Sequence, residues 1–240
     1  MTPKIVFSDF DGTLTQGTQM SPVFFKLIDL LREREIPLVV VTGRSQAWGH
    51  FLLTHFPLDV AITEGGGCLT RRHGHRLRDE FLVSLEEREE LEQVGRKIPK
   101  EFPGLYLSAD SQGRQTDRAI ELDDLKPKGL KARVEDFLKK EGVNFSCSNV
   151  HMNFWKGDFD KFQASKHYLE QDWESLEFSD CLFFGDSLND ESMFQHFPSV
   201  GVSNIAHILE QFQHRPQTVL QGVENAGPHG VFNYLKKQLN

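Results

Sequence analysis

The stretch PKIVFSDFDGTLT, residues 3–15, decides how the rest of the chain is interpreted. Its apolar run KIVFSD (4–9) is typical of a strand, and the two carboxylates of Asp9 and Asp11 follow at the strand's end, before a Gly-Thr turn. Residues at i and i+2 of an extended segment point the same way, so both carboxylates can face one site. The pair therefore indicates either a polar turn after a strand or a place that holds a cation.

Two other apolar runs also stop at a polar or Gly-rich turn, PLVVVTG (37–43) and CLFFGD (181–186). Near-continuous apolarity indicates strands buried on both faces, as in a parallel sheet covered by helices. Between the first two runs, residues 21–36 predict an amphipathic helix with Ser21 as N-cap and Pro22 at its first position. This βαβ pattern predicts an α/β fold with a doubly wound, mainly parallel sheet, to which shorter strands are expected to add at 59–64, 199–204 and 217–222.

The middle of the chain has a different pattern, with two charged helices and short alternating strands. Ser84 and Glu87 have the spacing of a capping box at the start of the first helix. The order of these elements, αββαββ, predicts an α+β module inserted between strands of the core. We expect a core of residues 1–78 and 157–240 and a cap of residues 79–156, whose helices are 84–98 and 128–142 and whose strands are 104–110, 114–122 and the pair within 143–156.

Composition limits the function classes. The chain has 240 residues, 38% hydrophobic and 26% charged, which is typical of a globular protein with a sizeable core. A net charge of -8 argues against binding to nucleic acid as the main activity. The three cysteines are too few and too scattered for a disulfide framework, and no stretch has the length and apolarity of a signal peptide or membrane span. We therefore expect a cytoplasmic protein with neither nucleic acid nor a membrane as partner; the oligomeric state stays open.

In an open parallel α/β sheet, ligands bind at the carboxyl ends of the strands. The second apolar run ends in Thr42, Gly43 and Arg44, and the third ends in GDSLND, which contains Asp186 and Asp190. Each feature alone is also compatible with turn chemistry, and Asp190 with capping a short helix. All of them occur at predicted strand ends, however, which favours a common site.

The aspartates at these strand ends form a group of hard oxygen ligands, and no His or Cys occupies a matching position. Such a group favours Mg²⁺ over Zn²⁺. Because Mg²⁺ also accepts phosphate oxygens, the pattern indicates a phosphorylated substrate. Thr42 and Lys161 are then candidates to bind the remaining phosphate oxygens.

Four segments together resemble the motifs of the haloacid dehalogenase (HAD) superfamily of Mg²⁺-dependent phosphohydrolases. They are DFDGTLT (9–15), VVVTGR (39–44), Lys161 at the head of a helix with Ala164, and FFGDSLND (183–190). VGVSNIAH (200–207) and PHGVFNYL (228–235) resemble later signatures of the superfamily, so the likeness spans the whole core. The position and pattern of the insert resemble the type IIB cap subgroup, which includes sucrose-phosphate, mannosyl-3-phosphoglycerate and trehalose-phosphate phosphatases and the Cof-like group.

This resemblance implies a role for each motif residue. Asp9 would be the nucleophile that forms an aspartyl-phosphate, and Asp11 the general acid and then the general base. Asp186 would bind Mg²⁺ together with Asp9 and the backbone carbonyl of Asp11, and Asp190 would support the metal. Thr42, Gly43 and Lys161 would hold the transferring phosphoryl group. An aspartate at position 11 is typical of phosphatases and phosphomutases, as opposed to the dehalogenases of the superfamily.

Several alternatives remain open from the sequence. Lys156 and Lys166 are alternatives to Lys161, because Phe162 stands where the superfamily commonly has a small residue. TEGGGCL (63–69) stands where the superfamily often has Asn-Gly. The main hypothesis is a phosphomonoesterase acting on a small phosphorylated metabolite, such as a sugar phosphate or a phosphorylated glyceryl glycoside. A phosphomutase and a non-catalytic ligand-binding homologue are the alternatives.

Candidates for substrate contacts come from the cap and from the second strand end. Alternation places Arg114 and Arg118 on one face of a cap strand, and His151 and Asn153 on one face of another. Arg44 can bind a phosphate-bearing ligand or pair with a neighbouring carboxylate. His73 and His75 have the spacing of metal ligands, but they flank Gly74 in a predicted hairpin turn, and a solvated turn is the preferred interpretation.

Overall fold

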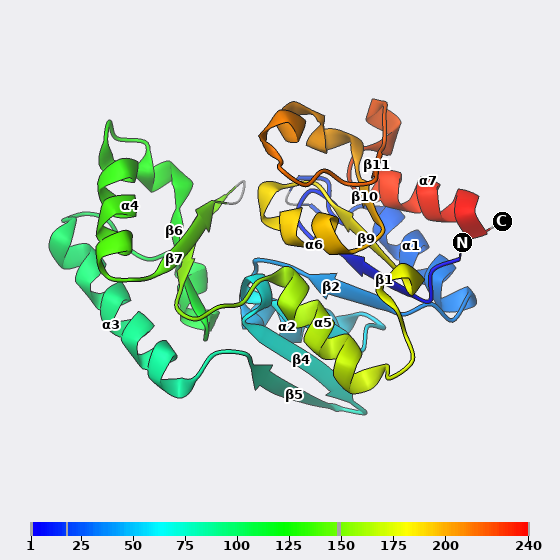
Figure 1. Cartoon of the computed structure of the whole chain (residues 1–240), viewed down its shortest axis with the longest axis horizontal. Coiled ribbons are helices and arrows are strands. Elements are labelled where there is room, and N and C mark those ends of the chain that lie inside the picture. Colours follow the sequence, from blue (N-terminus) through cyan, green and yellow to red (C-terminus); the bar gives the residue numbers. More distant parts are fainter. Residues whose placement is uncertain (1, 18, 148–149, 240) are drawn as a thin grey trace.

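The computed structural model of the chain describes residues 2–17, 19–147 and 150–239. It contains a core built on an eight-stranded sheet and a separate cap (Figure 1). The core strands lie in the order β11 (Thr218–Val219), β10 (Ser199–Gly201), β9 (Cys181–Gly185), β1 (Ile5–Ser8), β2 (Leu38–Val41), β3 (Val60–Thr63), β4 (Cys68–His73) and β5 (Arg76–Phe81). Neighbours from β11 to β3 are parallel, and β3, β4 and β5 pair antiparallel. The predicted α/β class with a mainly parallel sheet is confirmed.

Helices cover both faces of the core sheet. Alternate residues of each strand point to opposite faces, so β1 packs Val6 against one helical layer and Phe7 against the other. The first layer contains the predicted N-terminal helix α1 (Pro22–Glu33) together with α2 (Gln46–His55) and α7 (Pro228–Leu239). The second contains α5 (Lys161–Asp172) and α6 (Glu191–His196). The polar carboxyl ends of the parallel strands are left at one edge of this three-layer core.

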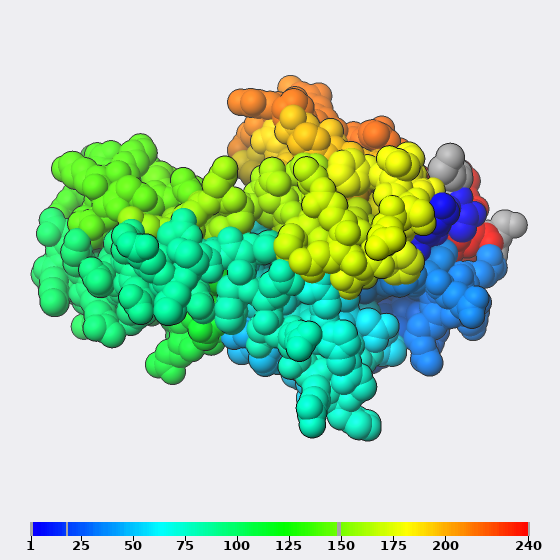
Figure 2. All heavy atoms as spheres, turned by 60° about the horizontal axis from the view of Figure 1, so that its bottom comes forward, coloured from blue at the N-terminus to red at the C-terminus, as the bar shows by residue number. Residues whose placement is uncertain are grey.

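The cap has its own sheet and hydrophobic core. Helices α3 (Leu85–Glu101) and α4 (Leu130–Lys140) pack on one face of an antiparallel sheet with the order β6 (Asp117–Glu121), β8 (His151–Trp155), β7 (Asn144–Cys147). The helices lie on the side of this sheet away from the core, so the other face of the sheet is turned toward the core (Figure 1). In the space-filling view the cap and the core form two adjoining lobes (Figure 2). The predicted capping box of Ser84 and Glu87 begins α3.

One predicted cap strand, 104–110, is not formed. This segment instead leads into a 3₁₀ helix, Ala109–Gly113. The backbone hydrogen-bonding groups at the edge of β6 have a serine as partner instead. The Ser111 hydroxyl accepts from Ala119 N (3.1 Å) and donates to Ala119 O (3.2 Å). Ser108 N adds a bond to Ala119 O at 2.8 Å. A serine side chain therefore takes the place of the expected strand partner, and the described cap sheet has three strands.

The expected division into core (1–78 and 157–240) and cap (79–156) stays a prediction, and β5, which crosses residue 78, belongs to the core sheet.

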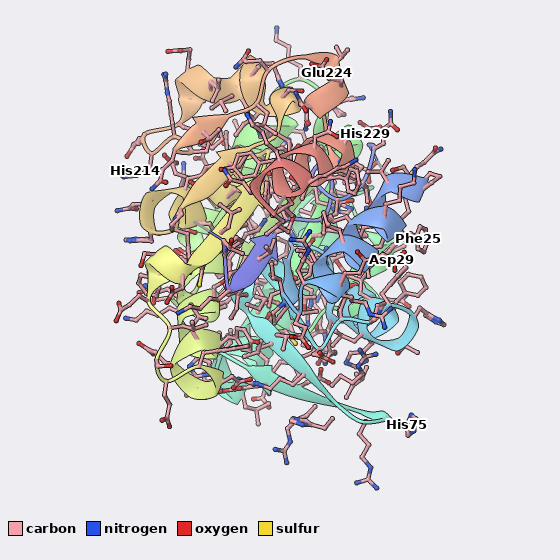
Figure 3. The ribbon with its side chains drawn as sticks, turned by 90° about the vertical axis from the view of Figure 1, so that its right-hand side faces the viewer. Phe25, Asp29, His75, His214, Glu224 and His229 are labelled. Atoms are coloured by element: carbon pink, nitrogen blue, oxygen red, sulfur yellow. The ribbon has the colours of Figure 1, made fainter. Side chains whose placement is uncertain are left out.

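His73 and His75 are exposed at the β4–β5 hairpin, and Figure 3 shows His75 at its outer tip, pointing away from the molecule. Cys68, Cys147 and Cys181 are free thiols. Within the described ranges, no helix combines the length and the apolarity needed to cross a membrane.

Candidate active site

Asp9 and Asp11 follow β1 at the carboxyl edge of the core sheet. Asp9 is buried, and its backbone N–H donates to Phe184 O at 2.9 Å, so the ladder to β9 fixes its position. The turn that follows needs glycine, because Gly12 has φ of +83° and a Cβ there would lie 2.3 Å from the Asp186 carboxylate. Both aspartates line one narrow cavity of about 40 Å³, together with Thr42 and Gly43 from the end of β2.

Lys161 reaches this site from the first turn of α5. Its ammonium donates to Asp9 Oδ1 at 2.6 Å and to Asp190 Oδ1 at 2.7 Å, and the residue is 1% exposed. Lys156 pairs with Glu90 and Lys166 with Glu170, both away from these aspartates. Of the three lysines considered from the sequence, the structure therefore brings Lys161 to the site.

Asp186 and Asp190 come from the loop after β9, and hydrogen bonds fix both carboxylates. Asp186 accepts from Thr13 Oγ1 at 3.0 Å and from Asn204 Nδ2 at 2.7 Å. Asp190 Oδ2 accepts from the backbone N–H groups of Asp186 and Ser187, each at 3.0 Å. The supporting roles of Thr13 and Asn204 were missed in the sequence, although both lie in segments that resemble superfamily signatures.

Three of these carboxylates could hold a metal ion. Asp9, Asp186 and Asp190 are buried, and each offers an oxygen within 4.8 Å of the others. Lys161 balances one of their three charges, so two negative charges remain in this group. Asp11 is balanced separately, by Arg44. An all-oxygen group with two uncompensated negative charges fits a hard divalent cation.

Burial and repulsion between carboxylates raise the pKa values of Asp9 and Asp186. Burial raises the pKa of Asp9 well above its ordinary value; Lys161 opposes that rise, and Asp190 and Asp186 add to it. Burial and the neighbouring Asp190 raise the pKa of Asp186 to about 7. Burial alone would lower the pKa of Lys161, but Asp190 and Asp9 raise it above the usual range. The cluster is therefore short of positive charge, and a cation would relieve it.

The loop after β2 provides the next part of the site. Thr42 is buried, and its Oγ1 accepts from Arg44 N at 3.1 Å. Arg44 binds Asp11 with two bonds, Nε to Oδ2 at 2.7 Å and Nη2 to Oδ1 at 2.6 Å, and its guanidinium lies 4.6 Å from the Trp48 ring centroid. The sequence left open whether Arg44 binds a phosphate-bearing ligand or pairs with a carboxylate, and the structure shows the pair with Asp11. Asp11 is therefore oriented by Arg44 as well as by its own turn.

Residues of the cap close the other side of the cavity. His151 and Asn153, on β8, line the same narrow cavity as Asp9 and Asp11. Arg114 is buried just before β6, where it binds Asp117 and Asp110 and donates to Gly43 O at 2.9 Å. Arg118 points to the other face of the cap sheet and pairs with Glu92 of α3 at 2.7 Å. The structure thus brings three of the four cap candidates to the interface with the core and places Arg118 outside it.

The placement of Arg118 follows from its neighbour Ile120 on β6. Ile120 lies in the hydrophobic core of the cap, so the face it shares with Arg118 is the face covered by helices. Asp117, on the opposite face, was missed. It binds Arg114 and Asn153, and burial raises its pKa to about 7. The apolar Ile120 is the sequence signal that could have separated these two positions.

A wider chamber of about 210 Å³ adjoins the narrow cavity and shares Gly43, Asn153 and Asn189 with it. Lys161 and Glu64 of the core and Asp117 and Trp155 of the cap line this chamber. The Trp155 Nε1–H is buried with no hydrogen-bond partner among the described residues. An aromatic ring, an unpaired donor and carboxylate and amide groups give this chamber both apolar and polar contacts for a ligand.

The chain has a mainly parallel α/β core with an α+β cap inserted after β5, and its four motifs meet at one edge of the core sheet. These features define a capped hydrolase of the HAD superfamily. Comparison with known proteins agrees. A model of the sucrose-6F-phosphate phosphohydrolase family matches residues 2–229, and the chain belongs to that family.

Among curated proteins, the chain is similar to a glucosyl-3-phosphoglycerate/mannosyl-3-phosphoglycerate phosphatase from Methanococcoides burtonii. The two are 26% identical over 96% of this chain and 95% of that protein.

Two solved structures share the fold. The sucrose-phosphatase of Synechocystis sp. PCC6803, solved with sucrose and phosphate, has a TM-score of 0.74 at 18% identity, covering 99% of this chain and 98% of that one. A phosphatase of the HAD superfamily from Bacteroides thetaiotaomicron has a TM-score of 0.67 at 16% identity, covering 98% of this chain and 95% of that one. The expected superfamily is confirmed.

Proposed function

We propose that the protein is a Mg²⁺-dependent phosphomonoesterase that hydrolyses a sugar phosphate or a phosphorylated glyceryl glycoside. The observation that carries this proposal is the position of Asp9. Its carboxylate is buried at the end of β1 with Lys161 Nζ 2.6 Å away, next to a chamber whose opposite wall is the cap. The similarity to phosphatases of phosphorylated sugars supports the same substrate class.

The residues present support a two-step transfer through Asp9. In the first step an Asp9 oxygen attacks the phosphorus and the bond to the leaving oxygen breaks. Asp11, which must release one of its two bonds to Arg44 in order to carry a proton, gives that proton to the leaving alcohol. In the second step the Asp11 carboxylate takes a proton from water, the water oxygen bonds to phosphorus, and the bond to Asp9 breaks. Inorganic phosphate and the free alcohol are the products.

Other side chains would bind the metal ion and the phosphoryl oxygens, and orient Asp11, during these steps. Asp9, Asp186 and the Asp11 backbone carbonyl would hold Mg²⁺, with Asp190 supporting the site; when bound, the ion would neutralise negative charge on the phosphoryl oxygens. Thr42, Gly43 and Lys161 would bind those oxygens, and Arg44 orients Asp11. Asn189 lies in the wall of both cavities, where its amide can contact the same group.

The substrate's alcohol portion would lie in the wider chamber. A sugar ring has apolar faces and a rim of hydroxyl groups, which match an aromatic ring beside fixed hydrogen-bonding groups. Trp155 offers its ring and an unpaired N–H, and Asp117 and Asn153 offer acceptors and a donor. The volume of about 210 Å³ suits one monosaccharide-sized group.

The test is release of phosphate from p-nitrophenyl phosphate and from a panel of phosphorylated sugars, with and without Mg²⁺. We expect Mg²⁺-dependent hydrolysis that falls by at least about 10³-fold in Asp9→Asn, because the nucleophile is removed. Isomerisation of a hexose phosphate after activation by a hexose bisphosphate, with little free phosphate, would instead indicate a phosphomutase. A folded protein that acts on no phosphoester would refute the proposal and indicate a ligand-binding homologue.

A further inference from the structure

The loop after β3, residues 64–67, is where the cap is attached to the core. The chain that leaves for the cap is held here, since Leu82 N donates to Gly67 O at 3.0 Å. The chain that returns from the cap packs here as well, because a Cβ on Gly66 would lie 2.2 Å from Asp160 O. Asp160 directly precedes Lys161, so this loop also lies next to the phosphate-binding helix. Both covalent connections of the cap therefore meet at one loop.

A third attachment at this loop is non-covalent and comes from Glu64. Its side chain is fully buried, and its Oε2 accepts from Thr116 N (2.5 Å), Thr116 Oγ1 (2.7 Å), Gln115 N (2.9 Å) and Asp117 N (3.2 Å). Oε1 accepts from Gln115 N at 3.0 Å and from Gln46 N, in the first turn of α2, at 2.9 Å. One carboxylate of the core thus binds three consecutive residues of the cap. Hydrogen bonds to an ionised acceptor are the strong ones.

The backbone at Glu64 is also unusual. Its φ is +55°, in the left-handed region that a residue with a Cβ seldom adopts. The cap packs closely against this loop, because a Cβ on Gly67 would lie 2.0 Å from Thr116 Oγ1. The position of Glu64 is thus held by its surroundings and matched to the residues of the cap.

The attachment fixes the part of the cap that faces the active site. Residues 115–117 lead directly into β6, and β6 pairs with β8 in the register Ala119 to Asn153. Asn153 lines both the narrow cavity and the wider chamber. Next to the same contact, Arg114 donates to Gly43 O in the phosphate-binding loop at 2.9 Å. A shift of β6 relative to Glu64 would therefore move Asn153 relative to Asp9.

We propose that Glu64 is a positioning residue that holds the inner face of the cap over the phosphoryl site. Besides the two chain connections, Glu64 is joined in attaching the cap by Arg114, which donates to Gly43 O at 2.9 Å, and by Ser45 Oγ, which donates to Asp110 Oδ1 at 2.6 Å. Of these contacts, Glu64 is the one that binds three consecutive cap residues, so without it the segment that leads into β6 is held less firmly and can shift. The inference rests on the proposed function, because it assigns Glu64 to recognition of the substrate's alcohol portion and not to the chemistry at phosphorus.

Glu64→Gln tests this role with almost no change in shape. Both carboxylate oxygens accept N–H groups, so either orientation of the glutamine amide places an NH₂ against a backbone donor. Glu92→Gln is the matched control. Glu92 also accepts a charge-assisted hydrogen bond, from Arg118 at 2.7 Å, but both residues belong to the cap, so this bond does not attach the cap to the core. Gly67→Ala is a second variant, which displaces Thr116 without changing any charge.

Two measurements are made on each variant with the full-length chain. Hydrogen exchange of the amides at 115–117 is expected to be at least 10-fold faster in Glu64→Gln and Gly67→Ala than in the native protein and Glu92→Gln. The kcat/KM for the best sugar phosphate is expected to fall at least 10-fold more than the kcat/KM for p-nitrophenyl phosphate, mainly through KM. A residue with a merely structural role would lower both kcat/KM values by the same factor.

The outcomes separate the inference from the proposed function. Equal exchange rates and an unchanged ratio of the two kcat/KM values in Glu64→Gln would overturn the inference. If Glu64→Gln does not fold, the same two results in Gly67→Ala decide. If the native protein hydrolyses no phosphoester, the proposed function fails and recognition by Glu64 fails with it, while the exchange measurement still decides whether Glu64 attaches the cap.

Discussion

On the core side of the active-site cavity, the polar side chains come directly after strands, whereas on the cap side they project from the face of a sheet. Asp9 and Asp186 are one residue beyond β1 and β9. Asp117 and Asn153 lie within β6 and β8, where Asn153 stands between two apolar residues and Asp117 between Thr116 and Arg118. The core residues are thus grouped by the topology of the sheet, and the cap residues by the choice of which face turns inward.

The two sides also differ in charge. The core side has three buried carboxylates against the one ammonium of Lys161. On the cap side, the buried guanidinium of Arg114 binds both Asp117 and the more exposed Asp110, and the Asn153 amide also donates to Asp117. We therefore expect the core side to depend on a bound cation and the cap side to be electrostatically complete. Substitutions on the two sides should therefore differ in their effects on stability and on the response to Mg²⁺.

The largest effect is expected at Lys161, whose ammonium pairs with Asp9 and Asp190 of the carboxylate group. Lys161→Met leaves two buried carboxylates without their partner, which costs about 3–5 kcal/mol of unfolding free energy, and removes a phosphate ligand, which lowers kcat about 10²–10³-fold. Urea denaturation and phosphate release measure the two losses.

The control is Lys156→Met, because Lys156 pairs with Glu90 on the surface at 2.5 Å. It is expected to cost less than about 1 kcal/mol and to keep its activity. Equal losses in the two variants would show that Lys161 has no special role in this site.

The two arginines of the cap are expected to differ although they are four residues apart. Arg114→Ala leaves buried Asp117 without its main partner and should cost about 3–5 kcal/mol. Arg118→Ala removes a pair with the half-exposed Glu92 and two bonds to the backbone carbonyls of Arg114 and Asp117, and should cost about 2 kcal/mol, with kcat/KM within about 2-fold of the native value. Thermal unfolding and kinetics measure both. A substrate defect in Arg118→Ala would place Arg118 at the site after all.

The core could be predicted from the sequence because its signals are local. A buried parallel strand is a continuous apolar run, and the residue after it lies at the ligand-binding edge, which was enough to group Asp9, Thr42 and Asp186. The expected βαβ unit and the helices α3 and α4 were found for the same reason. Their apolar periodicity, and the capping box of α3, are properties of short segments.

The cap was predicted less well, because its details depend on contacts between distant segments. The segment 104–110 alternates like a strand, but Ser108 and Ser111 bind the edge of β6 without a strand. Arg118 and Asp117 differ by one position, and only the packing of Ile120 decides which of them faces inward. Glu64 was noted in the sequence only within a segment that departs from the superfamily's Asn-Gly, and its contact with the cap had no local signal, since its cap partners are 51 to 53 residues away.

Asn153→Ala is expected to have a moderate effect, confined to substrates that fill the wider chamber. Loss of a hydrogen bond of about 1.4 kcal/mol lowers kcat/KM for a sugar phosphate about 10-fold, and p-nitrophenyl phosphate should change less than about 3-fold. Asn144→Ala, on the neighbouring strand but exposed, is the matched control. A loss of the same size for both substrates would assign Asn153 to the phosphoryl site.

The smallest effect is a dependence of Mg²⁺ stabilisation on pH. Burial and Asp190 raise the pKa of Asp186 to about 7, so the metal-free folded state binds its proton more tightly than the unfolded chain does. The stability from this proton is fully present below the unfolded pKa of about 4 and is lost as pH rises through about 7. Since Mg²⁺ binds the deprotonated carboxylate, it competes with this proton.

The increase in melting temperature caused by Mg²⁺ should therefore be small at pH 5.5 and reach about 5–10 °C at pH 8, with Mg²⁺ at about 100 times its dissociation constant. Differential scanning calorimetry at the two pH values measures it. Asp186→Asn should abolish the increase at both. Asp117→Asn is the control for a buried carboxylate with a similarly raised pKa on the electrostatically complete side, and it should leave the increase unchanged. If Mg²⁺ raises the melting temperature equally at both pH values, Mg²⁺ does not displace a proton from Asp186. The core side would then depend on a cation no more than the cap side does.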